Sequence, residues 1–249
     1  MSIKFNFSEK RFVVTGATSG IGRKISIDLA SAGATVLAIG RRTERLDDLK
    51  KLFPENIIPC AIDVNDFELL KNDLEKFGEV KKIDGSVHAA GINKFTPLRA
   101  FNWNDAEGII KTTLYAGIEL VRTLSAKKLT AARSSHILIA SVAGIKGEIG
   151  FTAYSSAKSA VIGAVRSMAL ELAIKDVRVN SITPGWLPTE MTDAIEARYP
   201  GRIDTIKLQH PLGLGSVEDI SNLAMFLLSD ESKWITGSNI VIDGGYSIR

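Results

Sequence analysis

Seven short apolar runs, most of them rich in β-branched residues, recur along the chain and are separated by longer amphipathic stretches. The runs are "FVVT" from Phe12, "TVLAI" from Thr35, "NIIPCAI" from Asn56, "GSVHAA" from Gly85, "HILIA" from His136, "VRVNSI" from Val177 and "NIVI" from Asn239. Apolar residues recur at helical spacing near residues 20–32, 43–52, 65–77, 103–130, 152–174 and 217–229. Strands that alternate with helices predict an α/β fold: a doubly wound parallel sheet of about seven strands with helices on both faces.

The chain length and composition favour a single domain over residues 1–249. The 249 residues are 45% hydrophobic and 24% charged, which is ordinary globular composition and enough for one sizeable core. The 31 basic and 28 acidic residues are interleaved and give a net charge of +3. Because no basic tail or patch stands out, we expect no nucleic-acid partner.

The chain also lacks the signals of secretion or membrane insertion. The N-terminal "MSIKFNFSEKRF" has no long apolar run, and no other stretch approaches the length that spans a bilayer. Cys60 is the only cysteine, which excludes an intramolecular disulfide and suits a reducing compartment. We therefore expect a soluble cytoplasmic protein with no membrane partner.

Residues 187–215 break the regular alternation. Prolines and glycines at positions 188, 200, 201, 211, 213 and 215 bracket a short helical segment around 191–198. A long insertion after the sixth strand is typical of a substrate lid, so we expect one here.

A glycine-rich turn, "TGATSGIG", follows the first strand and leads directly into a helical stretch. Gly16, Gly20 and Gly22 would let the backbone turn sharply and let a pyrophosphate come close to the helix N-terminus. The spacing differs from the usual G-x-G-x-x-G, and a glycine-rich surface turn is the alternative. The strand before it and the helix after it favour a dinucleotide site.

The end of the second strand, "AIGRR", bears on which dinucleotide binds. Sites for NAD usually place a carboxylate here, whereas Arg41 and Arg42 supply guanidinium groups that suit a 2′-phosphate. The alternative is that both arginines cover a helix start and pair with Glu44 or Asp47. Asp63, after the third strand, would either accept a hydrogen bond from an adenine amino group or cap the next helix.

The motif "YSSAK" places Tyr154 and Lys158 four positions apart, so that both lie on one face of the predicted helix. A free phenol has a pKa of about 10, and a nearby ammonium lowers that value towards the range of a useful acid or base. The spacing alone does not separate a catalytic pair from two neighbours on a helix.

Taken as a set, these motifs resemble the short-chain dehydrogenase/reductase family over nearly the whole chain. "TGATSGIG" is similar to the cofactor turn of that family, and "HAAG" at 88–91 stands where its Asn-Asn-Ala-Gly would be. Ser141 precedes Tyr154 by 13 residues, "TPGWLPTEM" resembles its Pro-Gly segment, and "ITGSNIVIDGG" resembles its closing strand. The resemblance implies a Rossmann-type fold and hydride transfer between a nicotinamide and a carbonyl or secondary alcohol.

The resemblance also assigns roles to individual residues. Tyr154 would exchange the proton of the substrate oxygen, Lys158 would lower its pKa and contact the nicotinamide ribose, and Ser141 would donate a hydrogen bond to that oxygen. Together with the arginines, it implies NADP(H) as cofactor. The implied cofactor-binding residues are Gly16, Thr18, Ser19, Gly20, Ile21, Gly22, Arg41, Arg42, Asp63, Val64, Ala90, Gly91, Tyr154, Lys158, Pro184, Gly185, Leu187 and Thr189. Thr189 would hold the nicotinamide carboxamide, and Trp186 would either border the ring or only pack.

Two departures from the family pattern stand out. The family usually carries an asparagine in the long fourth helix, which bends the helix and holds a relay water. In this chain the aligned place falls at about Thr113, and a threonine can still form a hydrogen bond with water or with a backbone carbonyl. His88 and Ala89 replace two asparagines, and a histidine inside an apolar strand is most often structural. No His, Cys or carboxylate cluster has metal-ligand spacing, so we expect no metal.

The substrate is left open by the sequence. A 3-oxoacyl thioester is the first expectation, with Lys127, Lys128 and Lys175 available to an acidic acyl carrier protein or only to solvent. A sugar, polyol or small secondary alcohol is the alternative enzyme substrate, and a dinucleotide-binding sensor or scaffold is the alternative outside catalysis. The apolar content of the two long helices predicts a homodimer or homotetramer.

Overall fold

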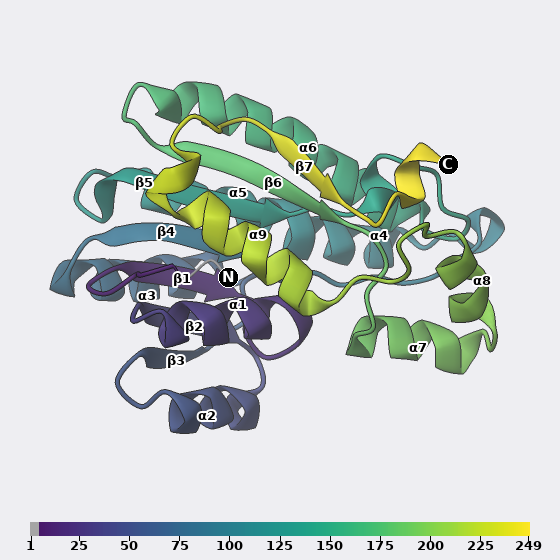
Figure 1. The fold of residues 1–249 in the computed structure, drawn as a ribbon, viewed down its shortest axis with the longest axis horizontal. Helices are drawn as coiled ribbons and strands as arrows, with labels where there is room; N and C mark the ends of the chain where they lie inside the picture. The colour runs from purple at the N-terminus through teal and green to yellow at the C-terminus, as the bar shows by residue number, and fades with distance from the viewer. Residues whose placement is uncertain (1–4) are drawn as a thin grey trace.

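A parallel sheet of seven strands runs through the molecule, and every neighbouring pair of strands is parallel (Figure 1). The computed structural model describes residues 5–249. The strands are β1 Arg11–Thr15, β2 Thr35–Gly40, β3 Ile57–Ala61, β4 Ile83–His88, β5 Thr130–Ile139, β6 Arg178–Pro184 and β7 Asn239–Ile242. All seven predicted strands are confirmed, in the order β3-β2-β1-β4-β5-β6-β7.

Helices cover both faces of this sheet. On one face lie α1 Gly20–Ser31, α2 Thr43–Leu52 and α9 Val217–Leu228, whose apolar residues share one core cluster with β1 and β2. On the other lie α3 Phe67–Val80, α5 Ala116–Leu124 and α6 Thr152–Ala173, while α4 Trp103–Ile110 packs against α6. Short 3₁₀ turns occupy Leu98–Ala100, Val142–Gly144, Asp230–Ser232 and Tyr246–Ile248. The predicted doubly wound α/β fold is confirmed.

The strand order creates a switch point between β1 and β4. The chain builds β1, β2 and β3 towards one edge and then crosses back to place β4 on the other side of β1. Thr15 and His88, at the ends of these two strands, stand in register. Helices leave on opposite sides there, so the crevice beyond the two carboxyl ends is where folds of this kind bind ligands.

The long helix predicted over residues 103–130 is interrupted and shorter. A π-helical turn, Lys111–Tyr115, separates α4 from α5, the helix ends at Leu124, and β5 already begins at Thr130. The early part of β5 escaped prediction because "TAARSS" lacks a strand's apolar pattern and Arg133 adopts a positive φ of 63°. Apolar periodicity therefore located the element but missed both its interruption and its end.

The insertion after β6 contains two helices rather than one. The predicted helix near 191–198 is α7 Glu190–Arg198, and a second helix, α8 Arg202–Leu208, follows after Gly201. Both lie beyond the end of the sheet at the right of Figure 1. The C-terminal segment contacts this region, since Leu212 donates its amide hydrogen to the carbonyl oxygen of Gly244 at 3.1 Å. Nowhere in residues 5–249 does a helix have the length and apolar character needed to cross a membrane.

Candidate active site

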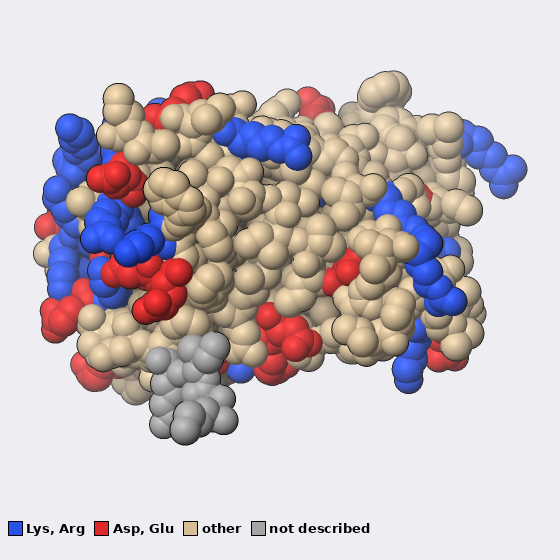
Figure 2. All heavy atoms as spheres, turned by 45° about the horizontal axis from the view of Figure 1, so that its top comes forward, with Lys and Arg blue, Asp and Glu red and all other residues tan. Residues whose placement is uncertain are grey.

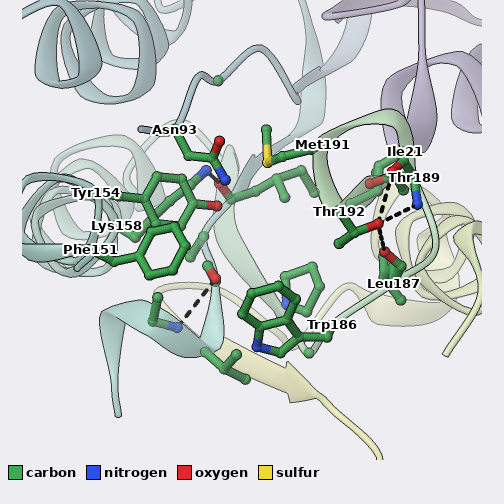
Figure 3. Close-up of a pocket in the computed structure, with 18 of the residues that line it drawn as sticks. Ile21, Asn93, Phe151, Tyr154, Lys158, Trp186, Leu187, Thr189, Met191 and Thr192 are labelled. Carbon is green, nitrogen blue, oxygen red and sulfur yellow. Dashed lines mark hydrogen bonds between the residues drawn. The ribbon is translucent and has the colours of Figure 1, made fainter. Parts of the chain in front are cut away.

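Ser141, Tyr154 and Lys158 meet in one cavity of about 140 Å³ beyond the carboxyl end of β5 (Figure 3). Ser141 begins the 3₁₀ turn after β5, and its Oγ accepts a hydrogen bond from the amide of Ala143 at 3.2 Å. Tyr154 and Lys158 lie one turn apart near the start of α6, with Lys158 Nζ 5.6 Å from the centre of the tyrosine ring. Residues from two separate elements are therefore brought together as the motif spacing predicts.

The Tyr154 phenol lies in an environment that favours its neutral form. Burial raises the pKa of Tyr154 above its ordinary value, and the Ser141 hydroxyl only partly offsets that rise. The ring of Phe151 stands edge-on to it, with centroids 6.0 Å apart. The expected lowering of this pKa by Lys158 is not found, because the ammonium is directed elsewhere.

Lys158 is turned towards the backbone of β5. Its Nζ donates a hydrogen bond to the carbonyl oxygen of Ile139 at 2.6 Å, and only 5% of the residue is exposed. Burial lowers the pKa of Lys158 to about 8. A lysine with this pKa changes charge near neutral pH, so it can pass a proton as well as hold one.

Thr113 lies in the π-helical turn, where the family pattern places a helix bend. The residue is fully buried, and its Oγ1 has no hydrogen-bond partner among the residues that the structure describes. Thr113 and Lys158 both lie next to Gly91, because a Cβ on Gly91 would lie 3.6 Å from Lys158 Nζ and 3.8 Å from Thr113 Oγ1. An unpartnered buried hydroxyl beside a titratable lysine suits a water-mediated contact, and π turns are frequent at functional sites.

His88 is held by a chain of hydrogen bonds that ends in the same turn. Its Nδ1 lies 2.9 Å from Thr15 Oγ1, and its Nε2 lies 3.1 Å from the carbonyl oxygen of Thr112. That carbonyl can only accept, so Nε2 carries the proton and Nδ1 accepts from the threonine hydroxyl. Burial lowers the pKa of His88 to about 4, so the ring is neutral. His88 is thus a satisfied core residue that ties β1 and β4 to the π turn.

A second, larger cavity follows the glycine-rich turn after β1. A Cβ on Gly22 would lie 2.4 Å from the carbonyl oxygen of Gly16, and a Cβ on Gly16 would lie 2.8 Å from the backbone of Ala89. Gly16 and Gly20 have φ values of 68° and 49°, which favour glycine. The turn lies against the end of β4 and leads into α1, whose N-terminal amides open towards this cavity. These features fit a dinucleotide pyrophosphate and do not fit an ordinary surface turn.

The arginines after β2 reach the same cavity. Arg41 Nη1 lies 3.8 Å from Asp63 Oδ2, whereas Arg42 donates from Nη1 to Glu190 at 2.8 Å. In the described part of the chain, neither Glu44 nor Asp47 pairs with them, so that alternative is wrong. Asp63 does not cap α3 either.

The cap of α3 is Asp66, whose side chain accepts a hydrogen bond from the amide of Leu69. Asp63 instead accepts one from the amide of Asn65 at 2.9 Å, within the turn that precedes the helix. Its carboxylate therefore lies at the edge of the large cavity, and its binding to the adenine stays a prediction.

The predicted cofactor residues divide between the two cavities. The larger cavity is lined by Gly16, Thr18, Ser19, Gly20, Ile21, Gly22, Arg41, Arg42, Asp63, Val64, Ala90, Gly91 and Thr189. The smaller is lined by Ile21, Gly91, Tyr154, Lys158, Pro184, Gly185, Leu187 and Thr189. Ile21, Gly91 and Thr189 border both, so the two cavities adjoin. Trp186 lines the smaller one and packs edge-on against Phe151 at 6.2 Å, so it both borders the cavity and packs.

The sequence patterns missed a set of polar contacts around the smaller cavity. Glu148, on its wall, accepts a hydrogen bond from the Tyr246 hydroxyl and lies 3.9 Å from Arg202 of α8. Lys146 donates to the Tyr246 carbonyl oxygen at 2.8 Å. Because these partners are about 50 to 100 residues apart in the chain, no local motif could have indicated them.

Comparisons with known proteins give a consistent picture. A family model described as enoyl-(acyl carrier protein) reductase matches residues 16–247. The chain is 33% identical over 241 residues to the 3-oxoacyl-(acyl-carrier-protein) reductase FabG of Thermotoga maritima, covering 95% of this chain and 97% of that one. It is also 33% identical over 245 residues to the protein of the same name from Escherichia coli strain K12, covering 96% and 98%.

Solved structures show the same architecture. A putative NAD(P)-dependent gluconate 5-dehydrogenase from Beutenbergia cavernae, with bound NADP, is 30% identical, with a TM-score of 0.90 over 99% of this chain and 100% of that one. A glucose/ribitol dehydrogenase of the short-chain type from Brucella melitensis is 29% identical, with a TM-score of 0.88 over 98% and 99%. With the motifs and the fold in agreement, the chain belongs to the short-chain dehydrogenase/reductase family of oxidoreductases.

Proposed function

We propose that this protein is an NADP(H)-dependent oxidoreductase that interconverts a carbonyl and a secondary alcohol. The observation that carries the proposal is the placement of Ser141, Tyr154 and Lys158 in a small cavity that adjoins the glycine-lined one. When bound, NADP(H) supplies or accepts the hydride. The residues of the chain bind and orient the cofactor and the substrate, and they exchange the proton of the substrate oxygen.

The catalytic residues divide this work between them. In the reductive direction, Tyr154 gives its phenolic proton to the substrate oxygen, and Ser141 donates a hydrogen bond to that oxygen as negative charge develops. Ser141 is free to do so because its Oγ accepts from Ala143 and keeps its own hydrogen. Lys158 and Thr113 then return a proton to the phenolate from solvent, which their shared position next to Gly91 supports.

Selection of NADP(H) rests on the arginines. No carboxylate follows β2, and Arg41 and Arg42 line the cavity at the place where an adenosine ribose would lie. The NADP reported in the Beutenbergia cavernae structure supports the same choice. Thr189, on the border of the two cavities, would hold the nicotinamide carboxamide.

The substrate proposed first is a 3-oxoacyl thioester, because the relatives from Thermotoga maritima and Escherichia coli carry that name. Residues 187–215, with α7 and α8, would form the lid over it. Three lysines lie near the start of β5 and the end of α6: Lys127, Lys128 and Lys175. Ser141 follows the other end of β5, so these lysines are at the opposite end of the strands from Ser141. These lysines do not flank the cavity that contains Ser141, Tyr154 and Lys158. Their position therefore favours solvation of the helix ends over docking of an acyl carrier protein at these lysines.

A sugar or polyol is the second candidate, and Glu148 is the observation that favours it. This carboxylate stands on the wall of a cavity that is otherwise mostly apolar. Its free lone pairs could accept from a substrate hydroxyl. The gluconate and glucose/ribitol dehydrogenases among the structural neighbours act on such polyhydroxy compounds by name.

We also propose a homodimer or homotetramer. Leu170 on α6 and Ile174, which follows this helix directly, are more than four-fifths exposed, as is Trp234 after α9. Figure 2, with the side that carries α6 and β7 turned forward, shows charged side chains mainly at the two ends and few in the centre. A face with few charged side chains suits a subunit contact, and so do large apolar side chains that are exposed. A monomeric mass by light scattering at working concentrations would rule this out.

One experiment tests the function directly. Purified protein should consume NADPH with acetoacetyl thioesters or with ketoses, and the relative kcat/KM values would rank the two substrate classes. Turnover with either class supports an enzyme. Tight NADPH binding with no turnover across the whole panel would favour the alternative of a dinucleotide-binding sensor or scaffold.

A further inference from the structure

Glu190, the first residue of α7, reaches across the large cavity to two arginines near α2. Its Oε2 lies 2.8 Å from Arg42 Nη1, and its Oε1 pairs with Arg45 Nη1. Arg42 is itself fixed, because its Nε and Nη2 both donate to Thr18 Oγ1, at 3.3 and 3.2 Å. Arg45 makes a similar contact to the Thr18 carbonyl oxygen at 3.5 Å. The Glu190 carboxylate therefore binds two guanidinium groups, those of Arg42 and Arg45, which contacts with Thr18 hold in place.

The Arg42 guanidinium group belongs to the same cavity as the glycine-rich turn, and Arg45 is joined to that cavity through Glu190. Glu190 and Arg42 both line it, together with Gly20. The residue before α7 lies next to the glycine-rich turn, because a Cβ on Gly20 would lie 3.7 Å from Thr189 Cγ2. The ion pairs therefore bridge the lid and the cofactor cavity, 148 residues apart in the chain.

The Glu190 side chain has no other structural task in the described contacts. The N-cap of α7 is Thr189, whose amide donates to the Thr192 hydroxyl at 2.7 Å. The pKa of Glu190 is held below its ordinary value by Arg42 first and then Arg45. The carboxylate is thus fully ionised at neutral pH and behaves as an anion held by arginines.

We propose that Glu190 is a cofactor-specificity residue, because its carboxylate competes with the 2′-phosphate of NADP(H) for Arg42 and Arg45. The proposal rests on the NADP(H) site proposed above. A 2′-phosphate prefers the same bidentate guanidinium edges as a carboxylate. NADPH must therefore displace Glu190, whereas NADH, which lacks this phosphate, leaves the ion pairs intact. The 2′-phosphate alone then releases the start of α7, next to Thr189 and Met191 on the wall of the substrate cavity.

The test is equilibrium binding to the Glu190→Gln variant, measured by calorimetry with NADPH, NADH, 2′,5′-ADP and 5′-ADP. Glutamine keeps the size of the side chain but removes the charge that attracts the arginines. Exposed ion pairs are weak, so we expect NADPH and 2′,5′-ADP to bind about three- to tenfold more tightly. Affinity for NADH and 5′-ADP should stay at the wild-type value. The gain should shrink as salt is added, because salt screens exposed charges.

Asp193→Asn is the matched control, since it removes one negative charge from the same first turn of α7. It should leave all four affinities unchanged. An equal gain for NADPH and NADH would overturn the proposal, because a simple barrier to entry would affect both. Unchanged or weaker NADPH binding in Glu190→Gln would also overturn it. If the wild-type protein fails to prefer 2′,5′-ADP over 5′-ADP, the NADP(H) site itself is wrong.

Discussion

The ammonium of Lys158 donates a hydrogen bond to the carbonyl oxygen of Ile139 and is not directed at the Tyr154 phenol. We therefore propose that Lys158 acts as a proton carrier behind Tyr154 rather than as a fixed charge beside the phenol. The buried phenol keeps a raised pKa, and the buried ammonium has a lowered one of about 8. These two shifts make the Lys158 ammonium the stronger acid of the pair, which favours proton transfer from Lys158 to a Tyr154 phenolate through a bridging group.

The pH dependence should be opposite in the two directions of the reaction. Reduction needs a protonated Tyr154 and a charged Lys158 to resupply it, so it should be full below the Lys158 pKa and fall as pH rises through about 8. Oxidation needs proton acceptors, so it should rise over the same interval. Rates in both directions across this range, at saturating NADPH or NADP, provide the measurement. If the rates of reduction and oxidation both rose, or both fell, as the pH increases through about 8, the proposed proton-transfer roles of Tyr154 and Lys158 would be contradicted.

Replacement of Tyr154 with Phe should abolish turnover in both directions. The ring and its contact with Phe151 are kept, but the hydroxyl that we propose exchanges the substrate proton is lost. NADPH affinity should stay within about twofold of wild type, because the phenol is on the substrate side of the cofactor. Steady-state rates together with a binding titration check both parts. A Tyr154→Phe protein that reduces its best substrate at the wild-type rate would return Tyr154 and Lys158 to two neighbours on a helix.

Replacement of Arg41 with Ala should weaken NADPH binding by about tenfold and NADH binding much less. A lost charge-assisted contact to a phosphate is worth roughly 1.5 to 3 kcal/mol, and competition with Asp63 reduces that value. Arg99→Ala, a change of an exposed arginine outside the cavity, serves as the control. Equal losses for both cofactors, or a wild-type preference for NADH, would show that Arg41 does not read the 2′-phosphate.

The Thr113→Val variant should turn over more slowly while NADPH affinity is nearly unchanged. Valine has the shape of threonine but removes the buried hydroxyl that faces the Lys158 side of Gly91. Because that hydroxyl has no partner among the described residues, the variant should be as stable as wild type or slightly more so. Thr112→Val is the comparison, since the Thr112 hydroxyl bonds Asn65 instead. Unchanged turnover with melting temperature alone affected would assign Thr113 to packing.

Gly117→Ala should destabilise the protein by about 1 to 3 kcal/mol despite the better helix propensity of alanine. The new Cβ would lie 2.9 Å from His88 Cδ2 and 3.0 Å from Leu138 Cδ2. The imidazole cannot move aside without breaking its bonds to Thr15 and Thr112. Gly108→Ala, where a Cβ meets nothing within 4 Å, should stabilise by up to about 1 kcal/mol. Denaturant unfolding of both variants without cofactor provides the comparison, and equal shifts would contradict the packing argument.

The fold could be predicted largely because its strands are buried and apolar. Val13 and Val36 lie in runs that alternate with helices, and such runs have few other structural outcomes. The polar start of β5 and the short helix α8 could not be predicted, because tertiary contacts stabilise them. The N-terminus of α8, for example, is held by Glu196, which accepts from the amides of Gly201 and Ile203.

The candidate site divides in the same way. Ser141, Tyr154 and the glycine-rich turn sit in contiguous motifs, so their spacing along the chain carries the information about their positions. The ion pairs of Glu190 and the hydrogen bond between Glu148 and Tyr246 join distant segments. These contacts form only when residues 187–215 and the C-terminal segment pack against the rest of the domain. No pattern within a window of the sequence contains that information.

The wall shared by the two cavities has a kinetic consequence. Ile21, Gly91, Thr189 and Met191 face both of them, so whatever fills the larger cavity becomes part of the wall of the smaller one. The second reactant then meets a finished surface only after the first has bound. We therefore expect a compulsory order, in which the dinucleotide arrives first and leaves last. Product inhibition should accordingly be competitive between the oxidised and reduced dinucleotides and non-competitive between a dinucleotide and the carbonyl compound.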